Sequence, residues 1–299
     1  MIPLKVLLTG ATGYIGSAVA AALARNGHTV LALSRSPDSD KRLAGKGYEV
    51  VRGDIREPKA VAELAASADA VVHAATTNDA EGAAVDTTLL QTLLARLEGT
   101  QKPLVYTSGV WSFGNTGEAI PDEDSPAMPL PLVAWRIPVE DAVRASAKRG
   151  VRGVVVRPGI VYGEAGGIPA MLAKEARETG TVRVVNTGRQ EWSCVYVHDL
   201  ADLYVRALTA PAGSVLHGVS GPYYAVRDLA VAASIGQGKG GKVQEWPLEE
   251  ARKAFGGFGD ALALHERVSA AKTRRLTGWS PTGPSILEEL LLGSYARKS

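Results

Sequence analysis

Three glycines near the start of the chain have the spacing of a loop that binds phosphate. Gly10, Gly13 and Gly16 lie in the stretch LLTGATGYIG, directly after a short apolar run and before an alanine-rich stretch. This is the order of strand, loop and helix that the glycine motif requires. The first glycine permits a tight turn, the second lets the backbone approach a pyrophosphate, and the third lets the helix pack on the strand. Because the helix N-terminus then faces the anion, we predict a dinucleotide site, to which the residues between the glycines also contribute: Thr12, Tyr14 and Ile15.

The residues that end the second predicted strand, HTVLALSR, indicate which dinucleotide is bound. An Asp or Glu at this point binds the ribose hydroxyls of NAD, whereas a cation accepts the 2′-phosphate of NADP. This chain has Ser34 and Arg35 there, so no carboxylate repels a phosphate and a guanidinium is placed to bind it. NADP(H) is therefore the expected cofactor and NAD(H) the less favoured one. The competing interpretation of Arg35 is a solvated surface side chain.

Two further strand ends are expected to contact the same cofactor. Asp54 and Ile55 follow the third strand in RGDI, where Asp54 is placed to accept from the adenine amino group. His73 ends the fourth strand and is interpreted as a hydrogen-bonded structural residue rather than a catalyst. The five histidines of the chain show no metal-ligand spacing. The stretch HAAT should lie beside the cofactor ribose and contribute Ala74, Ala75 and Thr76.

The elements that must position these residues alternate along the first half of the chain. Apolar runs at residues 4–10, 28–35, 48–54 and 68–75 are separated by helical patterns, and PLVYTSG and RGVVVRPG supply further strands. Such alternation implies parallel pairing through right-handed crossovers. We expect an α/β Rossmann fold, a doubly wound parallel sheet within residues 1–160, to which residues 191–215 return. Residues 161–190 and 216–299, where the alternation loosens, are expected to form a small discontinuous C-terminal lobe that binds substrate over the nicotinamide end.

Composition limits the class of partner. The chain has 33 basic and 31 acidic residues without a long run of one sign, which argues against nucleic acid and acidic membrane surfaces. No apolar run reaches the roughly 18 residues that cross a bilayer, and a lone cysteine, Cys194, excludes an internal disulfide. We therefore expect a cytoplasmic protein with a small-molecule substrate. The leucine stripe of DTTLLQTLLARLEG is interpreted as core packing, with a homodimer contact as the alternative.

Together these stretches resemble the short-chain dehydrogenase/reductase superfamily in its extended, NAD-dependent epimerase/dehydratase-like form. The resemblance rests on TGATGYIG, GDI, HAA, YTSG, VRPGIVYG and VYVHDLADLYVRAL, and it extends from residue 4 to about residue 290. It implies a Rossmann fold and a nicotinamide cofactor that also contacts the strand ends in YTSG and VRPGIVYG. The residues that it places there are Thr107, Pro158, Gly159 and Ile160.

The residues that perform chemistry in this superfamily are replaced in this chain. Extended members carry a Tyr, three residues and a Lys on one helix, with a glutamate four places after the Lys. Taking Glu140 as that glutamate puts Arg136 at the lysine position and Leu132 at the tyrosine position. Gly109 similarly occupies the usual serine position, with Ser108 just before it. The resemblance is therefore to an atypical subgroup that keeps the dinucleotide loop but lacks the standard active-site residues.

Substitutes for the missing groups are expected near the carboxyl end of the sheet. Leucine cannot move a proton, and the guanidinium of Arg136 keeps its proton near neutral pH, so Arg136 is expected to hold the cofactor ribose. The candidate proton donors are Ser108, Tyr162 and Tyr196, each with a structural role as the alternative. Tryptophans on segments that should face the site are candidates to line an apolar pocket, with core packing as the alternative: Trp111, Trp135 and Trp192.

The sequence favours an NADP(H)-dependent oxidoreductase that acts on a small carbonyl, alcohol or activated alkene. Its expected catalytic residues are Ser108, Arg136 and Tyr162. Two other functions stay open. An NADP-retaining epimerase or isomerase returns the hydride to its substrate, and a non-catalytic dinucleotide-sensing protein keeps the loop without the chemistry.

Overall fold

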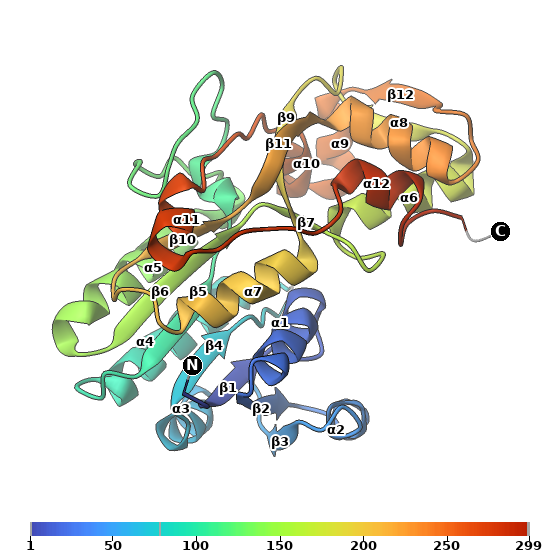
Figure 1. The fold of residues 1–299 in the computed structure, drawn as a ribbon. Coiled ribbons are helices and arrows are strands. Elements are labelled where there is room, and N and C mark those ends of the chain that lie inside the picture. The colour runs from blue at the N-terminus through green and yellow to red at the C-terminus, as the bar shows by residue number, and fades with distance from the viewer. Residues whose placement is uncertain (1, 78, 298–299) are drawn as a thin grey trace.

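A parallel sheet forms the centre of the main lobe. The computed structural model describes residues 2–77 and 79–297. The sheet has seven strands in the order β10-β6-β5-β4-β1-β2-β3, and all its pairs are parallel. This arrangement confirms the predicted Rossmann-type α/β fold (Figure 1). The strands are β1 (Lys5–Thr9), β2 (Thr29–Ser34), β3 (Glu49–Arg52), β4 (Ala70–His73), β5 (Pro103–Thr107), β6 (Arg152–Pro158) and β10 (Val215–Gly218).

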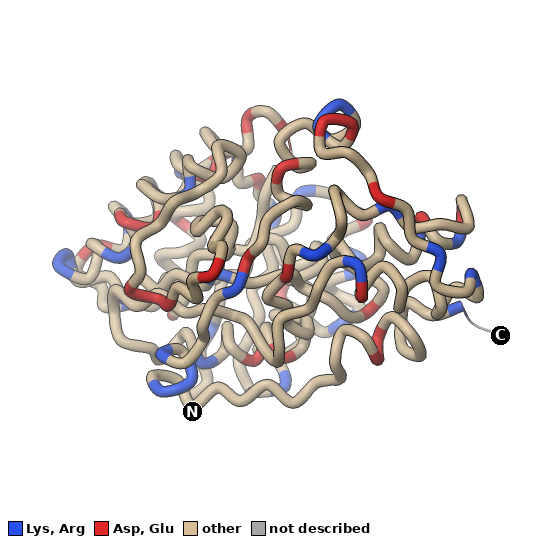
Figure 2. The backbone as a smooth tube through the Cα atoms, turned by 90° about the horizontal axis from the view of Figure 1, so that it is seen from above, with Lys and Arg blue, Asp and Glu red and all other residues tan. Residues whose placement is uncertain are grey.

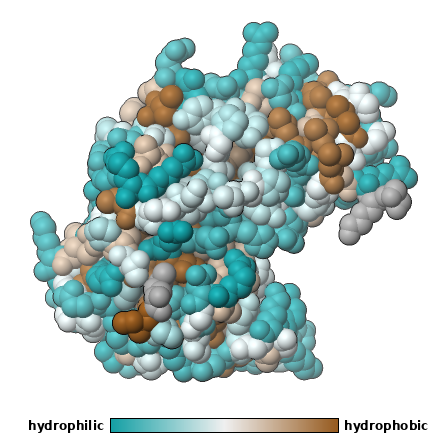
Figure 3. Space-filling view, viewed as in Figure 1, coloured by the Kyte–Doolittle hydropathy of each residue, from teal (hydrophilic) through white to brown (hydrophobic). Residues whose placement is uncertain are grey.

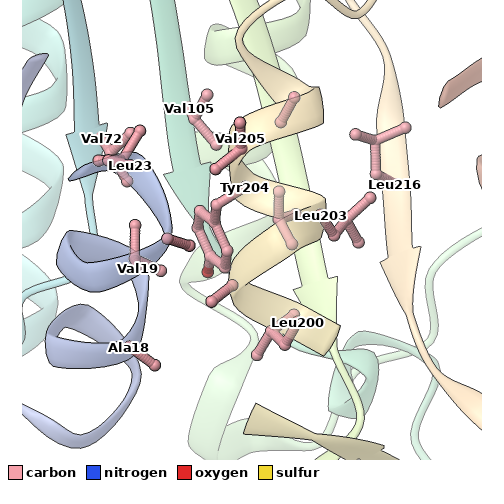
Figure 4. Packing of buried hydrophobic residues seen from close by; sticks show 14 of the residues in the cluster. Ala18, Val19, Leu23, Val72, Val105, Leu200, Leu203, Tyr204, Val205 and Leu216 are labelled. Carbon is pink, nitrogen blue, oxygen red and sulfur yellow. The ribbon is translucent and has the colours of Figure 1, made fainter. Parts of the chain in front are cut away.

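Helices cover both faces of this sheet, which explains why its central strands read as continuous apolar runs. Helices α1 (Tyr14–Arg25) and α7 (Val197–Ala207) pack together on one face. Figure 4 shows Tyr204 of α7 on the side of that helix that faces Val19 of α1, and both residues are fully buried. The other face carries α3 (Pro58–Ser67), α4 (Gly82–Leu97) and α5 (Arg136–Ala145), while α2 (Pro37–Ala44) flanks β2 and β3.

The leucine stripe of α4 is part of the core. Its side chains are at most 2% exposed and belong to the apolar cluster that joins α3, α4 and α5 to the sheet. Packing within one chain therefore accounts for the stripe, and its five leucines are not free to form a dimer contact: Leu89, Leu90, Leu93, Leu94 and Leu97.

A second group of elements forms a smaller lobe with its own apolar core. Figure 1 shows these elements gathered beyond the carboxyl ends of β5, β6 and β10. Its strands are β7 (Ile160–Tyr162), β9 (Glu191–Tyr196) and β11 (Ser220–Ala225) in one sheet, with β8 (Val182–Val185) and β12 (Val243–Trp246) in another. Its helices are α6 (Gly167–Thr179), α8 (Val226–Gly236), α9 (Leu248–Phe255), α10 (Gly257–Leu262) and α12 (Ile286–Leu291).

Two segments lie in a different place from the one expected. Residues 191–196 form β9, which pairs with β7 and β11 rather than with the parallel sheet, so the return to the main lobe begins only with α7. In the opposite sense, α11 (Ala271–Thr277) packs against β10 and α7 of the main lobe. A hydrogen bond fixes α11 there, because the backbone N–H of His217 in β10 donates to Thr273 Oγ1 at 2.7 Å.

Basic and acidic residues are interspersed along the described backbone in Figure 2, without an extended region of one sign. Figure 3 shows a mostly polar face with an apolar patch over α8 and α12, where Ile235 is 48% exposed. Within the described part of the chain, no helix is long and apolar enough to span a membrane.

Candidate active site

The glycine loop joins β1 to α1 and brings two backbones into contact. Gly10 has a φ of +78°, and a Cβ there would lie 2.5 Å from the Ala74 carbonyl oxygen. A Cβ at Gly16 would lie 2.0 Å from the Gly10 carbonyl oxygen, so Gly16 packs the helix against the loop. Gly13 is the N-cap of α1 and provides no side-chain hydrogen bond. The N–H groups of the first helical turn are therefore without a side-chain acceptor and can bind an anion.

A cavity of about 680 Å³ lies over this loop, and we call it the glycine-loop cavity. It is bounded by the carboxyl ends of β1, β2 and β4 and by the segment after β3. Residues that were not singled out from the sequence also line it, namely Leu33, Ser36, Ser39, Arg42 and Gly53. The residues that the sequence placed in the cofactor site and that line this cavity are Gly10, Thr12, Gly13, Tyr14, Ile15, Ser34, Arg35, Asp54, Ile55, Ala74, Ala75 and Thr76.

Two arginines mark the β2 end of the glycine-loop cavity. Arg35 follows β2, and Arg42 lies on α2, two helical turns further along the chain. Both are exposed, and among the described residues neither has a hydrogen bond or an ion pair. Arg42 was missed from the sequence because only the direction in which α2 folds back brings it to the cavity that Arg35 also lines. The pair forms a cationic corner suited to a phosphate.

A second cavity of about 330 Å³ adjoins the first, and we call it the Ser108 cavity. Tyr14 and Ile15 line both cavities, so the two spaces meet at the first turn of α1. The Tyr14 hydroxyl also donates to the Gly163 carbonyl oxygen at 2.8 Å, which ties this turn to the small lobe. The other residues that line the Ser108 cavity are Ser108, Gly109, Val110, Trp111, Ser112, Val133, Arg136, Pro158, Gly159, Ile160, Val161, Gly167 and Ile168.

Arg136 is held at the wall of the Ser108 cavity by main-chain and aromatic contacts. Its guanidinium donates to the Thr107 carbonyl oxygen at 2.9 Å and lies over the Trp135 ring, 4.6 Å from the ring centre. The Tyr106 hydroxyl lies 3.5 Å from the same nitrogen and donates to Asp86 at 2.8 Å. Burial raises the pKa of Tyr106, and the nearby positive charge of Arg136 opposes that rise. Arg136 is thus oriented by its surroundings rather than free on the helix surface.

Behind Arg136, a buried chain of hydrogen bonds continues into the parallel sheet. Asp86 accepts from Tyr106 through one oxygen and contacts His73 Nε2 through the other at 2.5 Å. The second ring nitrogen of His73 pairs with the Thr9 hydroxyl at 2.7 Å. Both nitrogens of His73 are therefore engaged, in agreement with the structural role expected from the sequence.

Ser108 is hydrogen bonded to a buried ion pair. Its hydroxyl donates to Glu140 Oε1, and Arg157 Nε lies 3.0 and 3.2 Å from the two oxygens of the same carboxylate. Glu140 is 1% exposed and Arg157 is 4% exposed, so both charges are shielded from water. A buried charge requires such a partner. Because the Ser108 hydrogen is directed to Glu140, the lone pairs of its oxygen can accept a hydrogen bond from elsewhere.

Tyr162 does not have the role expected for it. Its side chain is 4% exposed, its hydroxyl donates to the Pro284 carbonyl oxygen at 2.8 Å, and it lines neither cavity. Burial raises the pKa of this hydroxyl. Tyr162 is therefore not placed to supply a proton to a substrate in the Ser108 cavity, and Tyr196 likewise lies outside both cavities.

Three other expected positions also need correction. Thr107 has its hydroxyl engaged with the His73 carbonyl oxygen and the Tyr204 hydroxyl, both at 2.7 Å, and it lines neither cavity. Gly16 lies behind the loop rather than in the cavity. Leu132 is 43% exposed and lies in the 3-10 turn η2 (Pro131–Val133), whereas its neighbour Val133 lines the Ser108 cavity.

Trp111 and Ser112 complete the wall of the Ser108 cavity. Trp111 lines it as expected and makes an edge contact with Phe258, 5.9 Å between ring centres. Ser112 was not singled out from the sequence, although it lies in the same YTSGVWSFG stretch as Ser108. It is 2% exposed, and its hydroxyl has no hydrogen-bond partner among the described residues. The short helix η1 (Val110–Phe113) brings both residues to this wall.

Comparisons with known proteins agree with this fold. The model of the NAD dependent epimerase/dehydratase family matches residues 6–218. An uncharacterized protein of Schizosaccharomyces pombe is 28% identical, over 98% of this chain and 100% of that one. A 3-diazoavenalumate denitrifying reductase of Streptomyces sp is 29% identical, over 94% and 97% of the two chains. The solved structure of a UDP-glucose 4-epimerase of Thermus thermophilus in complex with NAD aligns with a TM-score of 0.80 at 22% identity, over 97% and 98%.

The fold and the glycine loop define an enzyme of the NAD(P)-dependent oxidoreductase type. The chain belongs to the NAD dependent epimerase/dehydratase family. Its cofactor is a nicotinamide dinucleotide, and the glycine-loop cavity fits such a group because Gly10 permits the tight turn and Gly13, at the N-cap of α1, presents backbone without a side chain. The resemblance to atypical extended short-chain dehydrogenases is confirmed. Within residues 2–77 and 79–297, no cluster of His, Cys, Asp and Glu could hold a metal ion.

Proposed function

We propose that this enzyme is an NADP(H)-dependent oxidoreductase acting on a small carbonyl, alcohol or activated alkene. The observation that carries the proposal is the junction of the two cavities at Tyr14 and Ile15. An arginine corner suited to phosphate lies in one cavity, and a mostly apolar chamber with oriented polar groups lies in the other. When bound, the nicotinamide would supply a hydride in reduction and accept one in alcohol oxidation, and the protein has to provide binding, orientation and proton transfer.

The preference for NADP over NAD is supported by Arg35 and Arg42. Both side chains line the glycine-loop cavity, and neither is neutralised by a carboxylate among the described residues. Ser34 takes the position where an acidic residue would bind the ribose hydroxyls of NAD. A guanidinium pair of this kind binds a 2′-phosphate through charge-assisted hydrogen bonds.

Proton transfer is assigned to Ser108 and Glu140. In the direction of alcohol oxidation, the Ser108 oxygen accepts the substrate hydroxyl proton while its own proton passes to Glu140 Oε1, to which it is already hydrogen bonded. In the direction of reduction, the same two protons move back. Arg157 holds the carboxylate in place, and Arg136 holds the cofactor ribose instead of the usual lysine. Ser112 is the alternative hydroxyl, because it lines the same cavity.

The small lobe is proposed to cover the nicotinamide end of the cofactor. Gly167 and Ile168 of α6 line the Ser108 cavity together with Pro158 and Gly159, which end β6 of the main lobe. The Tyr14 bond to Gly163 supports the same arrangement. Substrate would then be enclosed between the lobes, where water is excluded from the reacting groups.

An epimerase that retains NADP is the second candidate, favoured by the family model and by the epimerase among the solved structures. A panel of carbonyls, alcohols and activated alkenes, assayed with NADPH or NADP⁺, separates the functions. Net change in nicotinamide absorbance supports the oxidoreductase, and isomerised product without net change supports the epimerase. Tight NADPH binding with no turnover of any substrate would instead favour a dinucleotide sensor.

A further inference from the structure

A third cavity, of about 350 Å³, lies within the small lobe and has no part in the proposed chemistry. We call it the Trp246 cavity. It lies between α6, β8 and β12, and the ends of α9 and α10 close it. Its apolar wall is built from Met171, Leu172, Trp192, Trp246, Phe255 and Leu262. Met171 is 37% exposed and Phe255 is 40% exposed, so the wall reaches the surface.

The charged residues on the wall of this cavity cancel one another. Lys174 and Arg183 carry two positive charges, and Glu175 and Glu178 carry two negative ones. Arg183 is already engaged, because its side chain is hydrogen bonded to Glu175 and its guanidinium lies over the Trp246 ring, 4.1 Å from the ring centre. A nucleoside diphosphate needs uncompensated cations, whereas this wall suits an uncharged and largely apolar group.

One side chain of the wall carries a buried polar atom that has no protein partner. Trp192 is 1% exposed, and its indole Nε1–H has no hydrogen-bond acceptor among the described residues. Buried indole N–H groups usually find an acceptor, because leaving one unpaired costs free energy. An occupant with a single hydrogen-bond acceptor beside Trp192 would satisfy this group.

The Trp246 cavity adjoins the Ser108 cavity. Ile168 of α6 lines both, so the two cavities meet at this residue. We propose that the Trp246 cavity is a substrate subsite that binds an uncharged aryl or alkyl tail bearing one hydrogen-bond acceptor, while the reacting group lies in the Ser108 cavity. The inference rests on the proposed function, since the tail belongs to the substrate of that reaction. It names the class of substrate as a carbonyl compound or alcohol with an apolar tail.

Fluorine NMR of protein labelled with 5-fluorotryptophan tests the subsite without requiring turnover. The chain has five tryptophans, and their signals are assigned through single Trp-to-Phe variants. The NADP⁺-bound protein is titrated with 2-butanone, 4-phenyl-2-butanone, 4-(4-methoxyphenyl)-2-butanone and uridine diphosphate. We expect the two aryl ketones to shift the Trp192 and Trp246 signals saturably, at least ten-fold more tightly than 2-butanone. The methoxy compound should bind about five-fold more tightly than the phenyl compound through its acceptor.

Two wall variants and a control complete the test. Met171→Trp, which fills the mouth, and Phe255→Ala, which removes part of the wall, should each reduce the preference for aryl ketones over 2-butanone by five-fold or more. Ile235→Ala changes an exposed apolar residue of α8 that does not line the cavity, and it should keep that preference. Both wall positions are partly exposed, so these variants should fold.

The outcomes separate this inference from the proposed function. Shifts of Trp192 and Trp246 by uridine diphosphate but not by the aryl ketones would overturn the apolar subsite. Aryl-ketone shifts confined to Trp111 would overturn it as well, since the ligand would then lie in the Ser108 cavity alone. If the expected shifts appear but NADPH is never oxidised, the subsite stands and the proposed oxidoreductase function fails.

Discussion

At the scale of single residues, the chain keeps the groups that bind a dinucleotide and changes those that move a proton. Leucine and arginine stand where tyrosine and lysine are expected, and the structure supplies a hydroxyl, Ser108, bonded to a buried Glu140–Arg157 pair. General acid–base catalysis contributes about 10²- to 10⁴-fold. A relay through Ser108 and Glu140 can therefore compensate for the lost tyrosine only if both groups stay aligned.

The cofactor preference is tested by Arg35→Ala. We expect the free energy of NADPH binding to weaken by about 1.5 kcal/mol, the lower end for a hydrogen bond to a charged group, because Arg42 would remain in the cavity to bind the phosphate. NADH binding should be almost unchanged. Isothermal titration calorimetry gives both values, and Arg177→Ala in the small lobe is the control. Equal weakening of the two cofactors would show that Arg35 does not contact the 2′-phosphate.

The proton relay is tested by Ser108→Ala and Ser108→Thr. The alanine variant should lower kcat by about 10²-fold and change KM for NADPH little, whereas threonine keeps the hydroxyl and should restore much of the rate. Steady-state kinetics with a substrate that the panel of carbonyls, alcohols and alkenes identifies provide the measurement. If Ser108→Ala stays within three-fold of the parent while Ser112→Ala loses activity, Ser112 is the proton donor.

At the scale of elements, the start of α5 determines where the residue at the tyrosine position, Leu132, is placed. The helix begins at Arg136, and Leu132 lies before it in η2, packed toward α10 rather than on the same helical face. A Cβ at Gly257 of α10 would lie 3.8 Å from Leu132 Cδ1. Sequence spacing placed Arg136 on this helix, and the structure has it at the wall of the Ser108 cavity, but the spacing could not show that the helix starts four residues after Leu132.

Restoring the family pair should therefore fail. In Leu132→Tyr with Arg136→Lys, the new phenol lies off the Ser108 cavity, so we expect no gain in carbonyl reduction and a higher KM for NADPH through the loss of Arg136. Val133→Tyr is the matched variant, because residue 133 lines the Ser108 cavity and a phenol introduced there would lie at its wall. A gain of about 10²-fold in the double variant would show that Leu132 occupies the catalytic position after all.

A β-bridge pairs Trp192 of β9 with Glu266, whose carboxylate is buried. Glu266 is fully buried, and neither carboxylate oxygen has a partner among the described residues. Burial raises its pKa well above the ordinary value of 4.5. The folded state therefore holds a proton that the unfolded state loses above that value, so stability decreases as pH rises from 4.5 toward the folded pKa.

Glu266→Gln should remove this pH dependence. The variant is expected to gain stability relative to the parent as pH rises, by about 1.4 kcal/mol for each pH unit between the ordinary and the folded pKa. Urea unfolding at pH 5 and pH 8 gives the comparison, with exposed Glu245→Gln as the control. A stability difference that is the same at both pH values would contradict a raised pKa for Glu266.

At the scale of the whole molecule, the parallel sheet could be predicted from the sequence. Which of the two lobes the later segments of the chain join could not be predicted. Alternating strands and helices imply parallel pairing, and the glycine loop fixes where the cofactor site lies. The sequence of β9 is as apolar as a central strand, so its pairing with β7 and β11 depends on the small lobe that forms around it. The return of α11 to the main lobe depends on Thr273, whose long-range hydrogen bonds have no local signal.

The same limit applies to the candidate site. Residues that follow predicted strands, such as Arg35 and Ala74, line the cavities as expected. Arg42, Ser112 and Val133 were missed because their positions depend on how a helix or turn folds back over the sheet. Tyr162 was misplaced because its bond to Pro284 joins residues 122 positions apart.

Net hydride transfer between NADP(H) and a substrate can be followed with an isotope that moves from the cofactor to the product. NADPH carrying deuterium at C4 of the nicotinamide, prepared separately in each stereochemical form, is incubated with the protein and each candidate carbonyl or alkene. We predict that one of the two forms gives product containing one deuterium, with an equal amount of NADP⁺ released. Product that forms without deuterium while the labelled NADPH stays unchanged would contradict the account.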